Sequence, residues 1–581
     1  MENDSETVTE LSRTIGVPEL VSNILLNRGF SDISEIKMLL DPKLRNTIPD
    51  PSLLLDMDMG IERLVRAISN NEKVMILGDY DVDGITSTYL IVKYLSDVGH
   101  SPLYRLPNRF TDGYGISEQA LNEAVENGVD LIIAVDTGTS CIDEIEKTNQ
   151  AGIDSIIIDH HAQVYDTLPD AVAIINPNRR DQDEIGYSHI KHLCAAGVAF
   201  IFLIALQRTL RESGFFGRGD VYIDSMPVWN EPSLLDMTGV VAIGTMCDVM
   251  ELRGINRAIV KYALLNNRYP LGIRYLLQAL NIPKISSVDD LGFFIGPAMN
   301  AAGRLGDPTI AMKLLFAETD DEAECIALKL VSMNGERKVL ERCIVDNAVA
   351  MIEANQLFKN PGICVYGDGW HEGVIGIVAG RLKDRFHKPS FVVSFDKDGI
   401  GKGSARSIPG VHLGELLTTA KNEGLLVSGG GHSQAGGFTI TKDQISCFSD
   451  FINSVVRVDY VPTLDIDYTL TPMSDIAQLS RDLSVITPFG KGIEKPLVCM
   501  EKVRIEWAKK ICSGAHMMMW INGEYSAKKV KAMIFHCSAK RNILDPIEQN
   551  LGDLFDVVGY INVHEQYGPS FFVEDVRTSS P

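Results

Sequence analysis

The distribution of apolar and polar residues divides the chain into regions with different expected secondary structure. Residues 1–70 have apolar positions at helical spacing, as in VPELVSNILLNRG and GIERLVRAIS, and predict an N-terminal helical leader. In residues 71–319, short continuous apolar runs alternate with amphipathic stretches. The runs are VMILGD (74–79), LIIAVD (131–136), SIIID (155–159) and AVAIIN (171–176). Val/Ile-rich runs separated by helices predict a mostly parallel sheet that is covered on both faces.

Three further regions follow along the chain. Residues 320–357 have apolar residues at the spacing of a single long helix that joins domains. Residues 358–460 return to an α/β pattern, and residues 461–581 contain short β-rich runs typical of a small barrel. The predicted fold class is therefore α/β: a parallel-sheet domain joined by a long helix to a second α/β domain, followed by a C-terminal OB-like β-barrel.

Length and composition indicate a multidomain globular protein. The 581 residues exceed what one core supports, and 45% of them are hydrophobic. The most apolar stretch, residues 195–206, is shorter than the ~18 residues of a membrane span and predicts a buried helix. The first residues have no signal-peptide pattern. The ten cysteines include no CxxC pair, so we expect a reducing, cytoplasmic location without membrane association.

Charge is distributed unevenly along the chain. The net charge of −23 by itself argues against a nucleic-acid partner, because phosphate binding depends on Lys and Arg. Residues 495–541, however, contain ten basic and only three acidic residues. This local excess predicts a basic surface on the C-terminal barrel of an otherwise acidic protein.

The first chemical motif is GDYDVDG at residues 78–84, which precedes a predicted helix starting near Ile85. In an extended segment alternate side chains point the same way, so Asp79, Asp81 and Asp83 can face one pocket. Three neighbouring carboxylates repel one another unless a cation holds them. Taken alone, the motif is interpreted equally well as an exposed acidic loop.

Other ionisable residues lie at the ends of apolar runs that we interpret as strands. LIIAVD ends at Asp136, SIIID ends at Asp159 and continues with His160 and His161, and VVAIGTMCD ends at Asp248. Ligands bind at the carboxyl ends of strands in an open parallel sheet, so these side chains are expected to share one site. Hard oxygen ligands with one or two imidazoles favour Mn²⁺ or Mg²⁺ over zinc. This many carboxylates favours two ions that share one aspartate.

The motifs GDYDVDG, VDTG, DHH and GTMCD, in this order, resemble those of the DHH phosphoesterases. This superfamily includes RecJ nucleases, oligoribonucleases, cyclic-dinucleotide phosphodiesterases and family II pyrophosphatases. The resemblance implies metal ligation by Asp79, Asp81, Asp83, Asp136, His160 and Asp248. It implies catalytic roles for Asp81, Asp83, Asp136, His160 and His161, the last of which would contact the scissile phosphate. Asp159 is expected to orient the two histidines.

Further segments resemble the RecJ branch along nearly the whole chain. They are LLNRGFSD and LLDPKL near the start, LPNRFTDGYGIS (106–117), FIGPAMNAAGRLGDP (294–308), KGSARSIPG (402–410) and GGGHSQAGGF (429–438). The resemblance singles out Asn300 and implies substrate binding by Arg109, His161, Arg304, Ser404, Arg406, His432, Gly430 and Gly431. Glycines let backbone amides approach a phosphate, and arginines bind phosphate oxygens bidentately.

The same resemblance assigns a role to each region. Residues 71–319 correspond to the DHH phosphoesterase domain, residues 358–460 to the DHH-associated domain, and residues 461–581 to an OB-fold-like nucleic-acid-binding domain. In the last region Trp507, Trp520 and Tyr525 are candidates for stacking bases beside the lysines. A place in the barrel core is an equally good interpretation of each aromatic residue.

The RecJ resemblance implies a single-stranded-DNA-specific 5′→3′ exonuclease that uses two metal ions and releases mononucleotides in DNA repair or recombination. It implies a monomer that acts on single-stranded DNA, with a helicase or a single-strand-binding protein as candidate partner. An oligoribonuclease or a cyclic-dinucleotide phosphodiesterase is an alternative, although such relatives generally lack the leader helices and the barrel. A non-catalytic replication scaffold is a second alternative, which the intact aspartates and the DHH motif disfavour.

Overall fold

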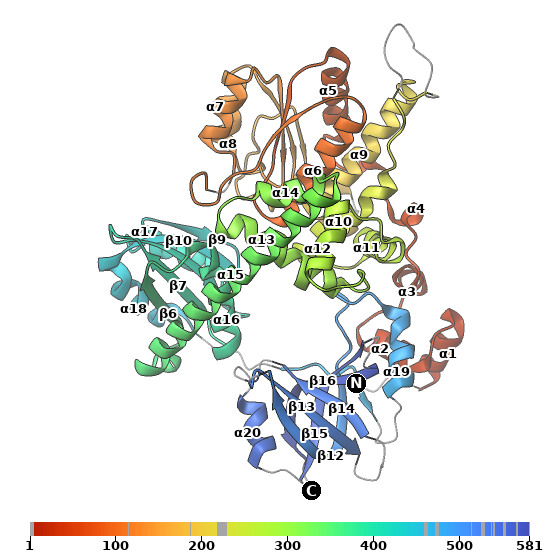
Figure 1. Cartoon of the computed structure of the whole chain (residues 1–581), viewed down its shortest axis with the longest axis vertical. Helices are drawn as coiled ribbons and strands as arrows, with labels where there is room; N and C mark the ends of the chain where they lie inside the picture. The colour runs from red at the N-terminus through yellow and green to blue at the C-terminus, as the bar shows by residue number, and fades with distance from the viewer. Residues whose placement is uncertain are drawn as a thin grey trace. The chain divides into compact units, whose positions relative to one another are not determined.

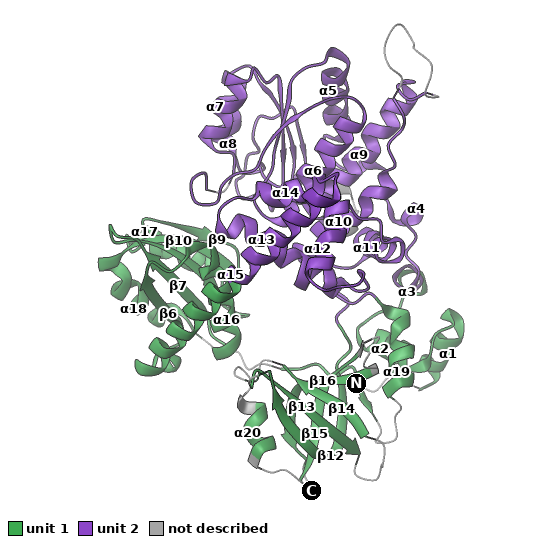
Figure 2. Ribbon diagram, viewed as in Figure 1, with its two compact units in different colours: residues 1–36, 338–487, 495–581 green, residues 37–337, 488–494 purple. Residues whose placement is uncertain are grey.

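The computed structural model describes residues 5–113, 115–185, 188–217, 229–457, 463–470, 476–512, 514–523, 529–535, 537, 541–549, 553–564 and 568–579. The chain divides into two compact units (Figure 2). The first unit contains residues 1–36, 338–487 and 495–581, and the second contains residues 37–337 and 488–494. The predicted long helix is present as α15 (Asp320–Ala354) and passes from the second unit into the first.

A five-stranded parallel sheet lies at the centre of the second unit, with the strand order β2-β1-β3-β4-β5. Its strands are β1 (Val74–Leu77), β2 (Leu103–Arg105), β3 (Leu131–Val135), β4 (Asp154–Ile158) and β5 (Ala173–Ile175). The four strands predicted before residue 180 are confirmed, whereas β2 has no apolar run and is absent from the prediction. Strand order reverses between β1 and β3, which is the position where open α/β sheets bind ligands.

Helices cover both faces of this sheet (Figure 1). They are α5 (Met57–Asn70), α6 (Val82–Asp97), α7 (Glu118–Glu126), α8 (Ile142–Gln150) and α9 (Ala195–Glu212). Alternate strand residues such as Ile76 and Ile133 pack with α5, α6 and α9, whereas Met75 and Ile132 pack with α7 and α8. Burial on both faces explains why the strands read as continuous apolar runs. The buried helix predicted at residues 195–206 is confirmed as part of α9.

Additional helices complete the second unit. They are α3 (Ile33–Leu40), which spans the unit boundary, α4 (Leu44–Thr47), α10 (Thr238–Cys247), α11 (Gly254–Asn266), α12 (Leu271–Ala279), the π-helix η5 (Asp290–Ile295), α13 (Gly296–Leu305) and α14 (Thr309–Phe316). The prediction that VVAIGTMCD forms a strand is wrong, because this segment is the buried helix α10. In a helix that is buried on every side, polar residues do not recur at helical spacing. Its sequence therefore resembles that of a buried strand.

The first unit contains a second sheet, with the strand order β6-β7-β8-β10-β9. Its strands are β6 (Ile363–Asp368), β7 (Ser390–Phe395), β8 (Ile400–Arg406), β9 (Ser428–Gly431) and β10 (Ala435–Thr441). The helices α16 (Glu372–Phe386) and α15 pack against one face of this sheet. The helices α17 (Leu413–Asn422) and α18 (Ile445–Val455) pack against the other face. The α/β pattern predicted for residues 358–460 is confirmed.

The barrel also belongs to the first unit. Its elements are β11 (Tyr468–Leu470), α19 (Ile476–Leu483), β12 (Val498–Ile511), β13 (His516–Gly523), β14 (Lys529–Ile534), α20 (Arg541–Gln549), β15 (Leu554–His564) and β16 (Gly568–Thr578). Strand β12 pairs with both β13 and β15, which closes a five-stranded barrel and confirms the OB-like prediction. The N-terminal helices α1 (Ser5–Ile15) and α2 (Glu19–Asn27) precede Arg28, which pairs with Asp467 at 2.6 Å. Across the described residues, every helix is too short or too polar to cross a membrane.

Candidate functional site

The turn between β1 and α6 carries the first three aspartates. Helix α6 begins at Val82, with Asp81 as its N-cap. The Asp81 carboxylate accepts hydrogen bonds from the N–H groups of Asp83 at 2.9 Å and Gly84 at 3.2 Å. The expectation of a single extended segment with a helix starting near Ile85 is therefore wrong, because Asp83 already lies in the first helical turn. Helical winding, rather than strand alternation, turns its carboxylate toward the site.

Asp83 is held in place by the N-terminus of α9. Its carboxylate accepts hydrogen bonds from the N–H groups of Ala195 at 2.7 Å and Ala196 at 3.0 Å. These donors are otherwise unpaired groups at a helix start, where a negative charge is stabilised. The carboxylate lies 3.8 Å from Nε2 of His160. The start of α6, the start of α9 and the end of β4 thus meet at Asp83 and His160.

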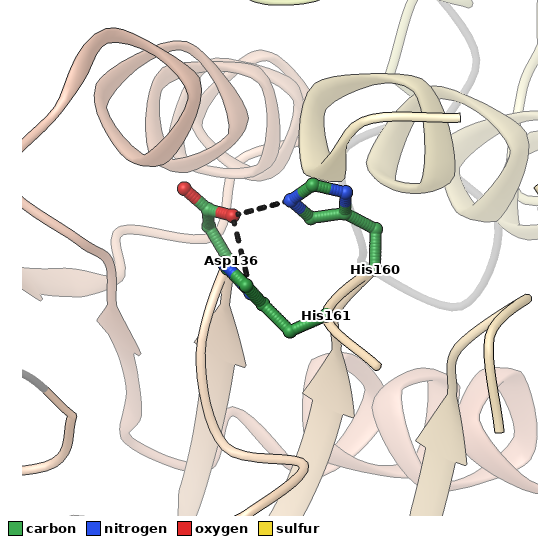
Figure 3. A group of neighbouring side chains, drawn as sticks. All are labelled: Asp136, His160 and His161. Atoms are coloured by element: carbon green, nitrogen blue, oxygen red, sulfur yellow. Dashed lines mark ion pairs between the residues drawn. The ribbon is translucent and has the colours of Figure 1, made fainter. Parts of the chain in front are cut away.

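The ends of β3 and β4 contribute an aspartate and two histidines (Figure 3). Asp136 follows β3 in a left-handed backbone conformation (φ 60°), and its carboxylate lies 3.2 Å from Nε2 of His160 and 3.8 Å from Nδ1 of His161. Asp159 follows β4, and its Oδ1 lies 2.8 Å from Nδ1 of His161. Asp159 therefore fixes the ring of His161, while Nε2 of His160 faces Asp136.

Asp248 reaches the cluster from the C-terminal end of α10 and not from a strand. Its carboxylate lies 3.6 Å from Nε2 of His160. The next residue, Val249, has a φ of 55°, which is an unfavourable conformation for a β-branched residue. Backbone strain of this kind is typical of positions where the surrounding structure enforces a functional geometry.

Three groups of side chains have ligand atoms close enough to hold a metal ion. Each group has its ligand atoms within 4.8 Å of one another. The groups are Asp79 with Asp81 and Asp136, Asp83 with His160 and Asp248, and Asp136 with His160 and His161. Asp136 and His160 each belong to two groups. The structure therefore brings together all six residues that the sequence identifies as ligands, and it adds His161.

The donor atoms of the cluster suit divalent cations. Among the described residues, Oδ1 of Asp79, Oδ1 of Asp136 and Oδ2 of Asp248 are buried without a hydrogen-bond partner. A buried carboxylate oxygen without a donor is costly unless a cation binds it. Carboxylates with imidazole are ligands that suit Mn²⁺ and Mg²⁺. The residues present thus fit a site for such ions.

The electrostatics of the cluster also indicate a cation site. Burial, together with the charge of Asp81, raises the pKa of Asp79 to about 8, and burial with the charge of Asp83 raises the pKa of Asp248 to about 8. Burial raises the pKa of Asp136 well above its usual range. A bound cation favours the ionised carboxylates and reverses these shifts.

The pKa of His161 is also raised, which for an imidazole favours the charged form. Burial is the largest single effect and lowers the pKa of His161, but the hydrogen bond to Asp159 and the charges of Asp159, Asp248 and Asp79 together raise it to about 9. Burial raises the pKa of the Asp159 carboxyl, but the hydrogen bond from His161, the charges of His161 and His160 and the bond from Thr139 together hold it well below its usual range. The contact with Asp159 therefore favours the protonated form of the His161 ring.

Arg109 lies beside the Asp79 end of the cluster. Its guanidinium carbon lies 5.1 Å from the centre of the Tyr80 ring. The charge of Arg109 lowers the pKa of Asp79, against the larger effect of burial. This cation is therefore close enough to act on a metal ligand and on a phosphate bound there.

Arg304 is brought to the same region by α13. The charge of Arg304 acts on the Tyr80 hydroxyl, whose pKa burial raises to about 12. The side-chain amide of Asn108 donates to the carbonyl oxygen of Gly306 at 2.8 Å, which ties the loop of Arg109 to the end of α13. Asn300 lies on the same helix. The two arginines singled out from separate segments of the sequence are thus neighbours of one acidic cluster.

The remaining predicted substrate-binding residues belong to the first unit. Ser404 and Arg406 lie on β8, and Nη1 of Arg406 donates to Oγ of Ser404 at 3.4 Å. Gly376 on α16 leaves room for this arginine, because a Cβ atom there would lie 3.3 Å from Nη2 of Arg406. Ala435 on β10 pairs with Arg406, and the N–H of His432 donates to Ala435 at 2.9 Å.

Two glycines of the run on β9 differ in their surroundings. Gly431 has a φ of 154°, and a Cβ atom on it would lie 2.3 Å from the carbonyl oxygen of Ala435. Gly431 is therefore needed for the close pairing of β9 with β10. A Cβ atom on Gly430 would meet no atom within 4 Å in the described part of the chain. Close packing therefore does not require glycine at position 430, and the role of this residue in binding a phosphate stays a prediction.

The barrel carries an aromatic and basic face on β12, β13 and β14. Trp507 and Trp520 are direct cross-strand neighbours, and Trp520 also pairs with Lys531. Each tryptophan is 39% exposed, so neither belongs to the barrel core. Buried residues such as Met519 and Ile521 form the core instead. Tyr525, the third candidate, lies outside the described residues.

Sequence reasoning missed the residues that fix the histidines. The side-chain amide of Asn176 donates to the carbonyl oxygen of His161 at 2.8 Å, and that of Asn178 donates to His160 at 2.5 Å. The N–H of Thr139 donates to Asp159 at 3.1 Å. Asn176 ends the apolar run AVAIIN on β5, so the strand-end rule that identified the aspartates could also have identified this asparagine.

Three family models match the chain: the N-terminal domain of the DHH family at residues 73–216, the DHHA1 domain at residues 359–458 and the RecJ OB domain at residues 466–570. The single-stranded-DNA-specific exonuclease RecJ of Escherichia coli (strain K12) is 33% identical over 500 residues, which is 83% of each chain. The protein of the same name from Bacillus subtilis (strain 168) is 31% identical over 99% of this chain and 70% of its own. The crystal structure of RecJ in complex with Mn²⁺ from Thermus thermophilus covers 100% of this chain and 79% of its own, with a TM-score of 0.79 and 24% identity, and has the same fold.

Proposed function

This chain belongs to the RecJ family of single-stranded-DNA-specific exonucleases within the DHH phosphoesterases, and we propose that it hydrolyses single-stranded DNA 5′→3′ to mononucleotides with two divalent metal ions. It is a metal-dependent hydrolase of phosphodiester bonds. The observation that carries the proposal is the cluster of three ligand groups that are linked through Asp136 and His160, each of which belongs to two of them. A shared carboxylate is typical of sites where two ions act on one phosphate.

The cofactor is Mn²⁺ or Mg²⁺. Asp79, Asp81 and Asp136 would hold one ion, and Asp83, His160 and Asp248 would hold the other. Asp136 also lies 3.2 Å from Nε2 of His160, so it is the carboxylate that the two ions would share. When bound, two such ions stabilise the charge of the phosphodiester in the transition state and lower the pKa of the attacking water.

The other residues would position the strand. Nδ1 of His161 is held by Asp159, so Nε2 would face the phosphate and would donate to one of its oxygens when the ring is an imidazolium. Arg109 and Arg304 would bind phosphate oxygens at the Asp79 end. We assign Ser404, Arg406, His432, Gly430 and Gly431 to the phosphate of the leading nucleotide. A bidentate arginine contact fixes the direction of a phosphate as well as its position.

The barrel face would hold the rest of the strand. Trp507 and Trp520 offer exposed rings on which bases can stack, and Lys531 supplies positive charge beside them. Stacking accepts any base, which suits an enzyme that degrades strands of arbitrary sequence. The leader helices and the barrel make an oligoribonuclease or a cyclic-dinucleotide phosphodiesterase a poorer assignment.

We further propose that the enzyme acts as a monomer in the cytoplasm, in DNA repair or recombination. The ten cysteines are all free, which suits a reducing compartment. Single strands arise where a duplex is unwound, so a helicase or a single-strand-binding protein is the expected partner.

Digestion of single strands labelled at one end or the other tests the function. With Mn²⁺, a 5′ label is expected to appear at once as a mononucleotide, whereas a 3′ label remains on progressively shorter strands. The matched control is the same strand annealed into a blunt duplex, which should resist digestion. Early release of the 3′ label contradicts the proposed direction, and equal digestion of the duplex contradicts the single-strand preference.

A further inference from the structure

Residues 488–494 adjoin the barrel in the sequence but belong to the unit that carries the metal centre. We call these residues the linker turn. The chain continues from them into β12, which begins at Val498. A segment that merely connected two parts of the chain would have no need of specific contacts, so the contacts of the linker turn require an explanation.

Hydrogen bonds to main-chain atoms fix the linker turn to the second unit. Arg257 on α11 is completely buried, and its guanidinium donates to the carbonyl oxygens of Pro488 and Leu39, each at 2.6 Å. The N–H of Leu252 donates to the carbonyl oxygen of Lys491 at 2.8 Å. Burying a guanidinium is costly unless its donors are used, so these bonds are a specific attachment.

The linker turn packs beside the end of α10 that delivers Asp248. Gly490 and Ile493 exchange backbone hydrogen bonds of 2.9 and 3.0 Å, which close the turn. A Cβ atom on Gly490 would lie 2.6 Å from Cδ1 of Leu252 and 3.8 Å from Cε of Met246. Met246 and Leu252 flank Asp248 in the sequence. The turn is therefore packed against the side chains of residues on both sides of this metal ligand, and it is also bonded to the main chain of Leu252.

Lys491 is an exposed cation in the middle of this turn. Its backbone is fixed by the bond from Leu252 and by the closure of the turn, while its side chain remains in solvent. The charge of Lys491 lowers the pKa of Asp248, against the larger effect of burial, which raises it. Geometry gives the same placement, because the Lys491 backbone is bonded to Leu252, four residues after Asp248, and Gly490 packs against Leu252 and Met246, so this exposed cation is anchored beside the Asp248 end of the cluster.

This lysine complements the cations at the other end of the cluster. Arg109 acts on Asp79, which shares a ligand group with Asp81. Lys491 acts on Asp248, which belongs to a different ligand group. A single strand carries one phosphate per nucleotide, so a strand that crosses the centre needs counter-charge at more than one position. Aspartates near a phosphate that has no metal ion beside it would otherwise repel it.

We propose that Lys491 binds a backbone phosphate next to the scissile one, at the Asp248 end of the metal centre, and thereby positions the strand for cleavage. This inference rests on the proposed function. Lysine suits this task because its ammonium group is a mobile point charge that follows a phosphate without demanding one orientation. Lys491 is thus a positioning residue that the motifs of the sequence do not include.

The test compares the full-length chain with the variants Lys491→Ala and Lys491→Arg. Lys313→Ala, which removes an exposed lysine of α14 in the same unit, is the matched control. One substrate is a single-stranded oligonucleotide, and the other is bis(p-nitrophenyl) phosphate, a phosphodiester without a neighbouring phosphate. Mn²⁺ binding is measured on each preparation by calorimetry.

Lys491→Ala is expected to raise the KM for the oligonucleotide about two- to fivefold, the effect of one exposed charge pair. It should also make log KM less dependent on log salt concentration, by a slope of about 0.7 for one lost single-strand phosphate contact. Lys491→Arg should restore both quantities, and Lys313→Ala should leave both at the wild-type value. Hydrolysis of bis(p-nitrophenyl) phosphate and Mn²⁺ affinity should be unchanged in every variant.

An unchanged KM and salt slope in Lys491→Ala overturns the inference, while normal strand cleavage by that variant leaves the proposed function intact. An equal loss on bis(p-nitrophenyl) phosphate, or weaker Mn²⁺ binding, also overturns it, because Lys491 would then act on the metal ligands rather than on the strand. Failure of the wild-type chain to cleave any strand with Mn²⁺ overturns the proposed function itself.

Discussion

The charged side chains of the metal centre are buried, whereas the lysines and aromatic rings of the barrel face are exposed to water. Asp83 and Asp136 are each 2% exposed, and Trp507 and Trp520 are each 39% exposed. Electrostatic interactions strengthen as the surroundings become less polar, so each buried carboxylate interacts strongly with a cation. Exposed lysines are screened by solvent and salt, and each contributes only a little.

This difference divides the two regions by function. The metal centre depends on a few side chains in one arrangement, because each buried oxygen without a hydrogen-bond donor needs a cation. The barrel face depends on the sum of many weak contacts, in which no single residue is essential. Loss of one ligand should therefore abolish cleavage, while loss of one barrel residue should produce a graded loss of affinity.

The largest effect is expected for Asp136→Ala. Asp136 is shared by two of the three ligand groups, so its loss should lower turnover by about 10³-fold or more, the range seen when a main electrostatic contact to a transition state is removed. Binding of single strands, measured by fluorescence anisotropy, should stay near the wild-type value because the barrel is intact. Asp143→Ala, an exposed aspartate of α8, is the control. Near-wild-type turnover in Asp136→Ala contradicts the two-metal assignment.

Arg406→Lys should have the next largest effect. Lysine keeps the charge but loses the bidentate contact, so the leading phosphate is misplaced and turnover falls by about 10²-fold. Mn²⁺ affinity should not change, because Arg406 is on β8 of the first unit and the proposed metal ligands are in the second. Cleavage is measured on strands with and without a 5′-phosphate, and the preference for the phosphorylated strand should diminish.

The matched control for Arg406→Lys is Lys402→Ala, which removes an exposed cation from the same strand. It is expected to leave both turnover and end preference at wild-type values. If Arg406→Lys behaves like this control, Arg406 is a structural arginine of β8 and the assignment of the leading phosphate to it is wrong.

The barrel face should respond more weakly, and in proportion to the number of rings removed. Trp507→Ala and Trp520→Ala are each expected to weaken binding of long single strands by about 1–3 kcal/mol, the value of one stacked base. Turnover of short oligonucleotides should be preserved. Val485→Ala removes an exposed apolar side chain of the same unit and serves as control. Unchanged affinity in the double variant would show that this face does not bind the strand.

The metal centre is partly predictable from the sequence because three of its six ligands, Asp79, Asp136 and His160, follow buried strands. The runs that end at Asp79, Asp136 and Asp159 are apolar since both faces of the sheet are covered, and parallel strands necessarily bring their ends to one edge. The sequence places Asp248 with the other acidic residues because it interprets the preceding run as a strand, whereas the structure brings Asp248 there at the end of a helix. Its apolar run is a helix that is buried on all sides, so the pattern contains no period that distinguishes helix from strand.

The sequence does not predict contacts between distant segments, because such contacts leave no local pattern of residues. The amides of Ala195 and Ala196 hold Asp83, and the amide of Leu252 holds the linker turn at Lys491. Strand β2 is missed because its three residues LYR are only partly buried at the sheet edge. The distinction between Trp507 as core and Trp507 as surface also depends on a bulge in β12 between Ile505 and Trp507, which strand alternation does not reveal.

The smallest expected effect concerns stability, and it tests the burial that distinguishes the metal centre from the barrel. Without metal ions, burial raises the pKa of Asp79 and of Asp248 from 3.8 to about 8. The folded protein then binds protons more tightly than the unfolded chain. The stability that these groups contribute is fully present below pH 3.8 and is lost as the pH rises through about 8.

Mn²⁺ should reverse this trend, because it binds the ionised carboxylates of the folded state. We expect the unfolding temperature in EDTA to fall by a few degrees between about pH 6 and about pH 8.5, while the increase caused by Mn²⁺ grows over the same interval. Asp248→Asn, which removes one of the two titrating carboxyls, should flatten both trends, whereas Asp143→Ala should follow the wild type. Differential scanning fluorimetry at the two pH values, with EDTA or Mn²⁺, measures each quantity. An equal Mn²⁺ effect at both pH values would mean that the carboxylates are already ionised without metal, and that the centre is as well solvated as the barrel face.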